Sequence, residues 1–201
     1  VGIDWRPNFE SPTGMLLMGG NTHDGEHIKC IRFDSVESNA FSIEFEFTLR
    51  EQQLQSIAWD VSGESFYLAR NNDICAVDLA SLYMPYRRKL LTFSKASGSP
   101  SAVETFITNP NLLYIGMRSG TIHSFDTRCG KESILNENTK SNDWMGLDHF
   151  LLSRNEISLI AQDTNGKIVT FDSRFSKSPV NTICAGFNNN RVRKRKFWMS
   201  P

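Results

Sequence analysis

Two short motifs place an aspartate and an arginine two residues apart. They are Asp126-Thr127-Arg128 and Asp172-Ser173-Arg174, and each follows a Phe that ends an alternating apolar stretch. An arginine just past a strand offers a planar fork of N–H donors that can bind the carboxylate of another protein. It can equally pair with a neighbouring acid or stay in solvent. An exposed ion pair contributes only about 0–1 kcal/mol, so stability alone does not require arginine at both sites.

Known catalytic and metal-binding signatures are absent from the sequence. It contains no Gly-x-Ser-x-Gly, no Gly-rich phosphate loop ending in Lys-Ser or Lys-Thr, and no His-Glu-x-x-His. Asp148-His149 has no accompanying nucleophile, and the segment 163–166 lacks the distal glutamate of a calcium loop. The four cysteines form no Cys-x-x-Cys pair, which argues against zinc and favours reduced thiols. We therefore expect no enzymatic activity, no cofactor and no metal.

The two motifs belong to a longer internal repeat. Asp34, Asp78, Asp126 and Asp172 are 44, 48 and 46 residues apart, and each follows a segment that alternates as a strand does. Upstream of each segment come a turn rich in Asn, Asp and Gly and another short strand, as in a hairpin. The predicted hairpin strands are 15–19 with 27–33, 66–69 with 73–77, 112–116 with 120–125, and 157–161 with 166–171. Further strands are predicted at 55–59, 103–107, 89–93 and 180–183.

A unit of four short strands with this period resembles the blade of a WD-repeat β-propeller. The resemblance covers roughly residues 14–184, and it implies an all-β fold, a partial propeller of about four blades. The Trp of the Trp-Asp signature is replaced by Phe33, Val77, Phe125 and Phe171, and the usual Gly-His pair is missing. Residues 1–13 are interpreted as a lead-in and 185–201 as a basic, disordered tail. The chain begins with Val1, so we expect a piece of a longer protein.

The paired Asp-x-Arg motifs are similar to the double Trp-Asp-x-Arg box of the cullin-4-associated factors. These WD-repeat substrate receptors dock on the damaged-DNA-binding adaptor of the cullin-4 RING ubiquitin ligase. The resemblance implies that Arg128 and Arg174 contact the adaptor, while Asp126 and Asp172 fix the turns. Both boxes depart from the family by having Phe in place of Trp.

Charge is distributed unevenly along the chain. Arg191, Arg193, Lys194, Arg195 and Lys196 form a basic run, and the rest of the chain has 17 basic against 22 acidic residues. The acidic body argues against nucleic-acid binding, because phosphates require a basic face. The run itself is either a nuclear-targeting signal, a nucleic-acid patch or a solvated tail. No apolar stretch reaches the length of a membrane helix, so we expect an intracellular protein of the nucleus or cytoplasm.

Three functional classes remain open at this point. The first is a substrate receptor of the cullin-4 ligase, which binds an adaptor and a target without any bond chemistry. The second is a WD-repeat scaffold of another intracellular complex, since one fold serves many functions. The third, an enzyme built on a propeller, would need converging acids, histidines or metal ligands that the sequence does not offer. Protein partners are expected in the first two classes, and no small-molecule substrate.

Overall fold

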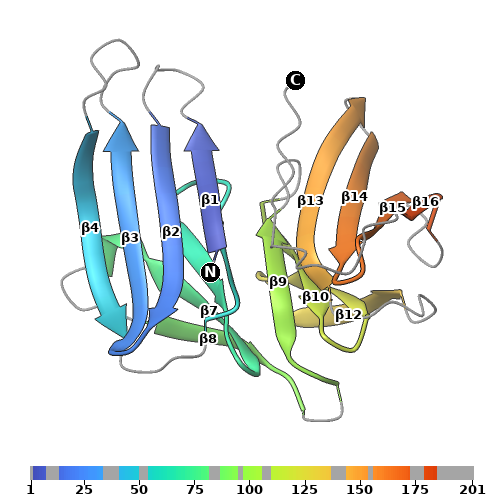
Figure 1. The fold of residues 1–201 in the computed structure, drawn as a ribbon, viewed down its shortest axis with the longest axis horizontal. Coiled ribbons are helices and arrows are strands. Elements are labelled where there is room, and N and C mark those ends of the chain that lie inside the picture. Colours follow the sequence, from blue (N-terminus) through green and yellow to red (C-terminus); the bar gives the residue numbers. More distant parts are fainter. Residues whose placement is uncertain are drawn as a thin grey trace. The chain divides into compact units, whose positions relative to one another are not determined.

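The computed structural model describes most of the chain and divides it into two compact units (Figure 1). Unit 1 is Val1–Thr92 and unit 2 is Phe93–Pro201. The described residues are 2–7, 14–33, 41–49, 54–81, 87–94, 97–105, 110–136, 144–153, 156–172 and 179–184. Among them, no helix has the length and apolar character needed to cross a membrane.

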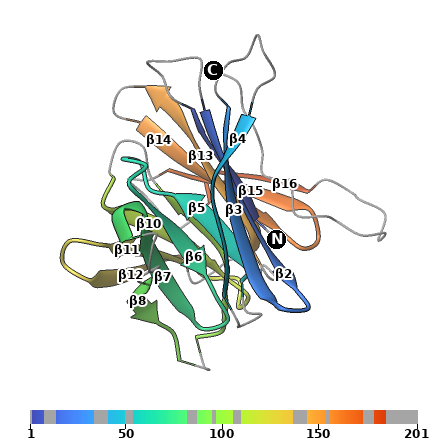
Figure 2. The same cartoon turned by 90° about the vertical axis from the view of Figure 1, so that its left-hand side faces the viewer.

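Unit 1 consists of two four-stranded antiparallel sheets, each a simple meander in which neighbours in sequence are neighbours in space. The first sheet contains β1 (Gly2–Pro7), β2 (Gly14–Thr22), β3 (Gly25–Phe33) and β4 (Phe41–Leu49). The second contains β5 (Ser56–Trp59), β6 (Ser65–Ala69), β7 (Asp73–Asp78) and β8 (Arg87–Thr92), with the short 3₁₀ helix η1 (Leu79–Ser81) after β7. Figure 2 shows β5 to β8 side by side.

Unit 2 repeats this arrangement with a third and a fourth sheet. The third contains β9 (Pro100–Thr105), β10 (Leu112–Met117), β11 (Ile122–Asp126) and β12 (Lys131–Asn136). The fourth contains β13 (Trp144–Ser153), β14 (Glu156–Asp163), β15 (Lys167–Asp172) and β16 (Asn181–Cys184). In both units the first strands of the two sheets contact each other, β1 with β5 and β9 with β13.

The all-β class and the central hairpin of every sheet are confirmed. Each predicted hairpin corresponds to the second and third strands of one sheet, in antiparallel register. The sequence-based prediction did not include β1, β4, β12 and β13, which lie at sheet edges. Of these, β1 falls within residues 1–13, where the sequence suggested only a lead-in, and pairs with β2 from Gly2↔Gly19 to Pro7↔Gly14.

The tight turns use the conformations that their residues favour. Between β10 and β11, Gly120 has φ +84° and donates its N–H to the Met117 carbonyl at 3.1 Å. Between β14 and β15, Oδ1 of Asp163 accepts the N–H of both Asn165 and Lys167 at 2.9 Å. Positive φ is open to glycine because it has no Cβ, and an aspartate side chain can replace a backbone acceptor in a turn.

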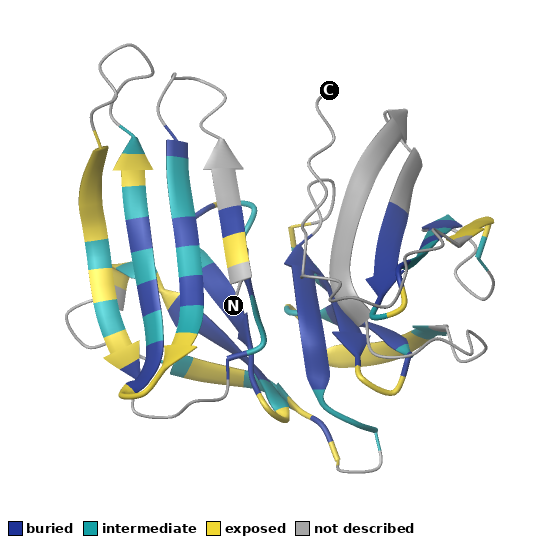
Figure 3. Ribbon diagram, in the orientation of Figure 1, coloured by how far each residue is buried: buried dark blue, intermediate teal, exposed yellow. Residues whose placement is uncertain are grey.

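The core of unit 1 lies between its two sheets. Phe66 on β6 is fully buried and its ring lies 5.9–6.3 Å from the rings of Phe45, Phe47 and Trp59. The packing is close, since a Cβ added to Gly19 would lie 2.7 Å from Leu54. Figure 3 shows the resulting alternation of burial along β2 and β3. Period-two burial is what a strand with one face on a core requires.

Polar contacts also join the two sheets of unit 1 within this core. Glu26 on β3 is fully buried, and its Oε1 accepts a hydrogen bond from Nε of Arg70 at 3.1 Å. Oδ2 of Asp4 on β1 accepts the backbone N–H of Trp59 on β5 at 2.6 Å. Since buried charges are tolerated only when they are paired, these contacts fix how the first sheet sits on the second.

Unit 2 has a corresponding core between the third and fourth sheets. Its buried members are Ala102, Tyr114, Ile122, Leu159, Ala161, Val169 and Phe171. Burial raises the pKa of Tyr114 to about 12, because the phenolate would lose its hydration there. Ile122 begins β11 and is fully buried in this core, so one end of the strand that carries Asp126 is held by packing.

The buried ion pair of unit 1 gives a stability prediction. Glu26→Ala leaves the Arg70 guanidinium buried without its carboxylate, so we expect the free energy of unfolding to fall by about 3–5 kcal/mol. The double variant Glu26→Leu/Arg70→Met removes both charges and should be more stable than Glu26→Ala. Urea denaturation measures the free energy of unfolding of the wild-type chain and of both variants. Lys29→Ala, which removes the partly exposed pair with Glu46, serves as control and should change stability by less than about 1 kcal/mol. Equal losses for Glu26→Ala and Lys29→Ala would contradict the prediction.

Candidate protein-docking turn

The turn from β11 to β12 is the part of the candidate site that the structure describes best. Asp126 ends β11, and its carbonyl accepts the Gly130 N–H at 2.9 Å, which closes the turn. Thr127 is anchored separately, because its N–H and its Oγ1 donate to the Asn111 carbonyl at 2.8 and 3.1 Å. The turn is therefore held both by its own closing bond and by the segment that precedes β10.

Arg128 lies across this turn and is bound to Asp126 by three hydrogen bonds. Oδ1 of Asp126 accepts the Arg128 backbone N–H at 2.9 Å and its Nε–H at 3.1 Å, and Oδ2 accepts from Nη2 at 2.7 Å. The arginine side chain is 63% exposed, against 24% for the aspartate. The guanidinium is thus held in one orientation on the surface of the third sheet.

These contacts act on the ionisation of Asp126. Hydrogen bonds from the side chain and backbone of Arg128 lower the pKa of the Asp126 carboxyl from 3.8 to about 2. The same hydrogen bond and charge raise the pKa of Arg128, so the pair is fully ionised at neutral pH.

Only one edge of the guanidinium is used by Asp126. Arginine has five N–H donors, and the bidentate contact takes the Nε–H and one Nη2–H. Within the described part of the chain, the edge formed by Nη1 and the second Nη2 hydrogen has no protein acceptor. That edge can accommodate both oxygens of a carboxylate in an end-on arrangement.

A comparison with the second sheet separates the roles of aspartate and arginine. Asp78 ends β7, and its Oδ1 accepts the N–H of Ala80 at 2.9 Å. Asp126 makes the same bond to the residue two positions on, at the same distance. Because this capping bond forms with alanine in the third position, it does not depend on an arginine there.

The remaining predicted site residues are placed only in part. Asp172 ends β15 and is partly buried, and its Cα lies opposite Ser158 in the register of β14 and β15. Arg174 and Asp34 lie outside the described residues, as does the basic run from Arg191 to Lys196. The structure thus brings Asp126 and Arg128 together, and the role of Arg174 stays a prediction.

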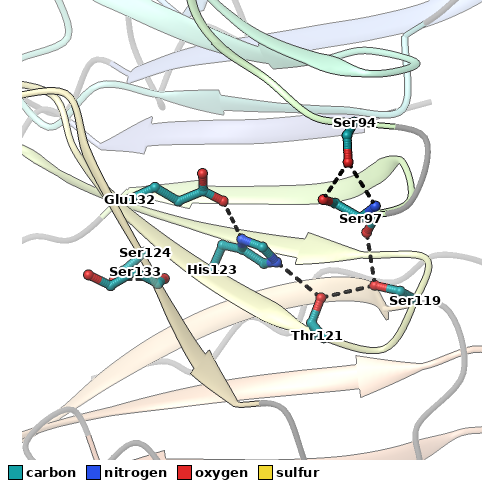
Figure 4. Close-up of polar contacts among 8 residues, drawn as sticks. All are labelled: Ser94, Ser97, Ser119, Thr121, His123, Ser124, Glu132 and Ser133. Carbon is teal, nitrogen blue, oxygen red and sulfur yellow. Dashed lines mark hydrogen bonds and ion pairs between the residues drawn. The ribbon is translucent and has the colours of Figure 1, made fainter.

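Sequence reasoning missed two features of this sheet. It left open whether the arginine binds a partner's carboxylate, a neighbouring acid or solvent, and it did not identify Asp126, two residues earlier, as the acceptor at its Nε edge. It also did not pair His123 with Glu132, which lies on the next strand (Figure 4). The signal for the second contact is visible only once the register is known, because Phe125 pairs with Glu132 and His123 lies on the same face two residues away.

Thiols and metals offer no alternative centre in the described residues. Cys30 and Cys75 are buried and Cys129 is exposed, and all three are free thiols. Desolvation, together with the nearby charge of Asp73, raises the pKa of the Cys75 thiol to about 11. No group of three or more His, Cys, Asp and Glu side chains there could hold a metal ion.

Comparison with known proteins gives no family assignment. No protein-family model matches the sequence. No curated protein matches it at a significant level.

The lowered pKa of Asp126 predicts how the turn responds to acid. The carboxylate is favoured in the folded protein, so its contribution to stability is complete above the ordinary value of 3.8 and is lost as pH falls through about 2. We therefore expect the Arg128 amide resonance to titrate with a midpoint near 2 in NMR spectra. Arg128→Ala removes the first of the causes, so the midpoint should move up toward 3.8. A wild-type midpoint at 3.8 would show that the three bonds do not persist in solution.

Proposed function

We propose that this chain is part of a WD-repeat β-propeller and serves as a non-catalytic protein-interaction scaffold, a substrate receptor of a cullin-4 RING ubiquitin ligase. Four successive antiparallel meanders of four strands support the propeller arrangement. So does the contact between first strands, β1 with β5 and β9 with β13, because first strands of successive blades meet around a propeller axis. The aspartates that end β7, β11 and β15 occupy equivalent positions in three of these sheets.

The observation that carries the docking role is the state of Arg128. Its side chain is held by Asp126, is 63% exposed and, among the described residues, has one guanidinium edge without an acceptor. A side chain that is already ordered loses less conformational entropy on binding, which favours affinity. In this proposal Arg128 binds a carboxylate of the damaged-DNA-binding adaptor, and Arg174, the arginine of the second Asp-x-Arg motif, makes a corresponding contact.

A scaffold that performs no catalysis needs only surfaces that bind its partners. Such a receptor raises the local concentration of a target near the ligase and requires no acid, base or nucleophile of its own. The proposed partners are the adaptor and a protein target, and the proposed location is the nucleus or the cytoplasm.

The test is binding of the full chain to the purified adaptor, measured by surface biosensor. We expect Arg128→Ala to weaken binding by about tenfold or more, because truncating one partner of a desolvated charge pair leaves the other unpaired. Arg128→Lys should bind more weakly than the wild-type chain and more tightly than Arg128→Ala, since lysine keeps the charge but not the planar fork of donors. The double variant Arg128→Ala/Arg174→Ala should bind the adaptor more weakly than Arg128→Ala.

Arg88→Ala is a matched control for this experiment. Arg88 is also an exposed arginine, but it lies on β8 in the second sheet. Its replacement should leave binding to the adaptor unchanged. If Arg88→Ala also weakened binding, the loss at Arg128 would reflect net positive charge and not a specific contact. Undiminished binding by the double arginine variant would refute docking through these residues. No binding by the wild-type chain would refute the receptor function and leave a scaffold of another complex.

A further inference from the structure

The first sheet of unit 1 has a second apolar face, on the side away from its core. Strand β2 contains Met15, Leu16, Leu17 and Met18 in succession. Leu17 is fully buried and Met15 packs against the core, while Leu16 and Met18 lie on the other side and are only half-buried. A sheet with one solvated face alternates apolar and polar residues, whereas a strand covered on both faces has a continuous apolar run. The sequence of β2 is that of a strand covered on both faces.

The strand register shows which side chains share this second face. Met18 lies opposite Ile3 on β1, and Leu16 lies opposite Ile31 on β3. Ile31 in turn lies opposite Ile43 on β4. Directly opposed residues of antiparallel strands project to the same side of the sheet, so an apolar row extends from β2 across β3 to β4.

A β-bulge in β4 turns the start of this strand toward the same face. Cys30 pairs with Phe45 and Ile31 pairs with Ile43, so Glu44 is an extra residue between the two pairs. In a regular strand, residues 41 and 43 would lie on the core side together with Phe45. Bulges redirect side chains in this way, and here the effect is to move two large apolar side chains out of the core.

The redirected side chains are well exposed. Phe41 lies two residues before Ile43 on the same side of the sheet and is 64% exposed, while Ile43 is 52% exposed (Figure 3). Ile3 is 48% exposed. A contiguous apolar patch of this kind marks an interaction site. We call this patch the outer face; it consists of Ile3, Leu16, Met18, Ile31, Phe41 and Ile43.

The charges beside the outer face balance each other. Lys29 lies opposite both Met18 and Glu46, in the row that begins with Ile3. Its Nζ is 3.5 Å from Oε2 of Glu46, and both side chains are partly exposed. A face whose positive and negative charges are paired does not repel an identical face, whereas unpaired like charges across an interface are costly.

We propose that the outer face is a dimer interface, covered by the same face of a second copy of this chain. Strands β2, β3 and β4 are each nine residues long, so the four-stranded face measures about 30 Å by about 19 Å. Two such faces bury about 1,100 Å² together, close to the lower limit for a specific interface. The dimer is therefore weak and depends on concentration.

The shape of the outer face favours a sheet as its occupant. The opposite face of the same sheet is covered by another four-stranded sheet, through Phe66 and Leu68 of β6. A second copy supplies a sheet with a matching apolar pattern and balanced charge, and a two-fold axis lets one patch serve both copies. This inference goes beyond the proposed receptor function and uses neither Arg128 nor Arg174, so either proposal can fail while the other holds.

Dimerisation is tested by analytical ultracentrifugation of the full chain over about 1–100 μM. We expect the average mass to rise toward that of a dimer. Ile43→Thr keeps a β-branched residue in an exposed position but removes apolar area from both copies, so it should weaken dimerisation by about tenfold or more. The matched control is Ile134→Thr on β12, because Ile134 is 50% exposed and belongs to unit 2. It should dimerise as the wild-type chain does.

Two results of this experiment would overturn the proposal. One is a wild-type chain that stays monomeric over the whole series, which would leave the outer face to another occupant, such as a further sheet of the repeat. The other is an equal effect of Ile43→Thr and Ile134→Thr, which would show that the dimer forms through a different surface.

Methyl NMR distinguishes packing of the outer face from pairing of two β4 edges, since β4 is the last strand of its sheet. Met18 lies on β2, two strands from that edge, and Met15 lies on the core side of the same strand. As the dimer forms, the Met18 methyl should lose its broadening by a soluble paramagnetic probe, while the Met15 signal should not change. A Met18 methyl that stays equally accessible in the dimer would overturn packing through the outer face.

Discussion

The structure depends on the burial of one sheet face against another. A four-stranded meander has one or two apolar faces and cannot keep them in water, so each sheet must pack on a neighbour. In unit 1 this requirement places Phe66 among the rings of Phe45, Phe47 and Trp59. It also brings Leu54 so close to Gly19 that an added Cβ would require the leucine side chain to shift. In unit 2 the third and fourth sheets share a comparable core.

Packing of this kind determines where the functional side chains point. A third strand of a sheet has hydrogen-bonded neighbours on both sides, so its register and its two faces are fixed. Ile122 is buried at the start of β11, and His123 faces the other side of the sheet with Phe125. The strand then ends at Asp126, where the chain has to turn. The docking turn therefore follows a strand that is paired on both sides, with β10 and with β12.

The sequence predicts the central hairpins because they combine two independent signals, alternation and turn residues. Edge strands are less clearly marked, since one side of the ladder is open and polar residues are tolerated there. Strand β4 alternates Phe and Ile with Ser and Glu, but it contains no aspartate landmark and was not recognised as part of the repeat. β12 begins Lys131-Glu132-Ser133, which reads equally well as a loop.

Side-chain pairing was harder to predict than the strands. The contact between Arg128 and Asp126 depends on a turn conformation that brings residues two apart into a bidentate arrangement. The contact between His123 and Glu132 depends on a register that the sequence does not specify. In both cases the residue types were visible and the geometry was not, because cross-strand neighbours follow from the fold rather than from distance along the chain.

The turns after β7 and β11 show why the arginine, rather than the aspartate, marks a candidate interface. Both aspartates accept the N–H of the residue two positions on, so the cap is a property of the repeat. With Ala80 in the third position the capping bond still forms, and an exposed ion pair adds little to stability in water. Arg128 therefore has no structural task that its turn requires. A guanidinium that is bound on one edge and, among the described residues, has no acceptor on the other is suited to a second carboxylate.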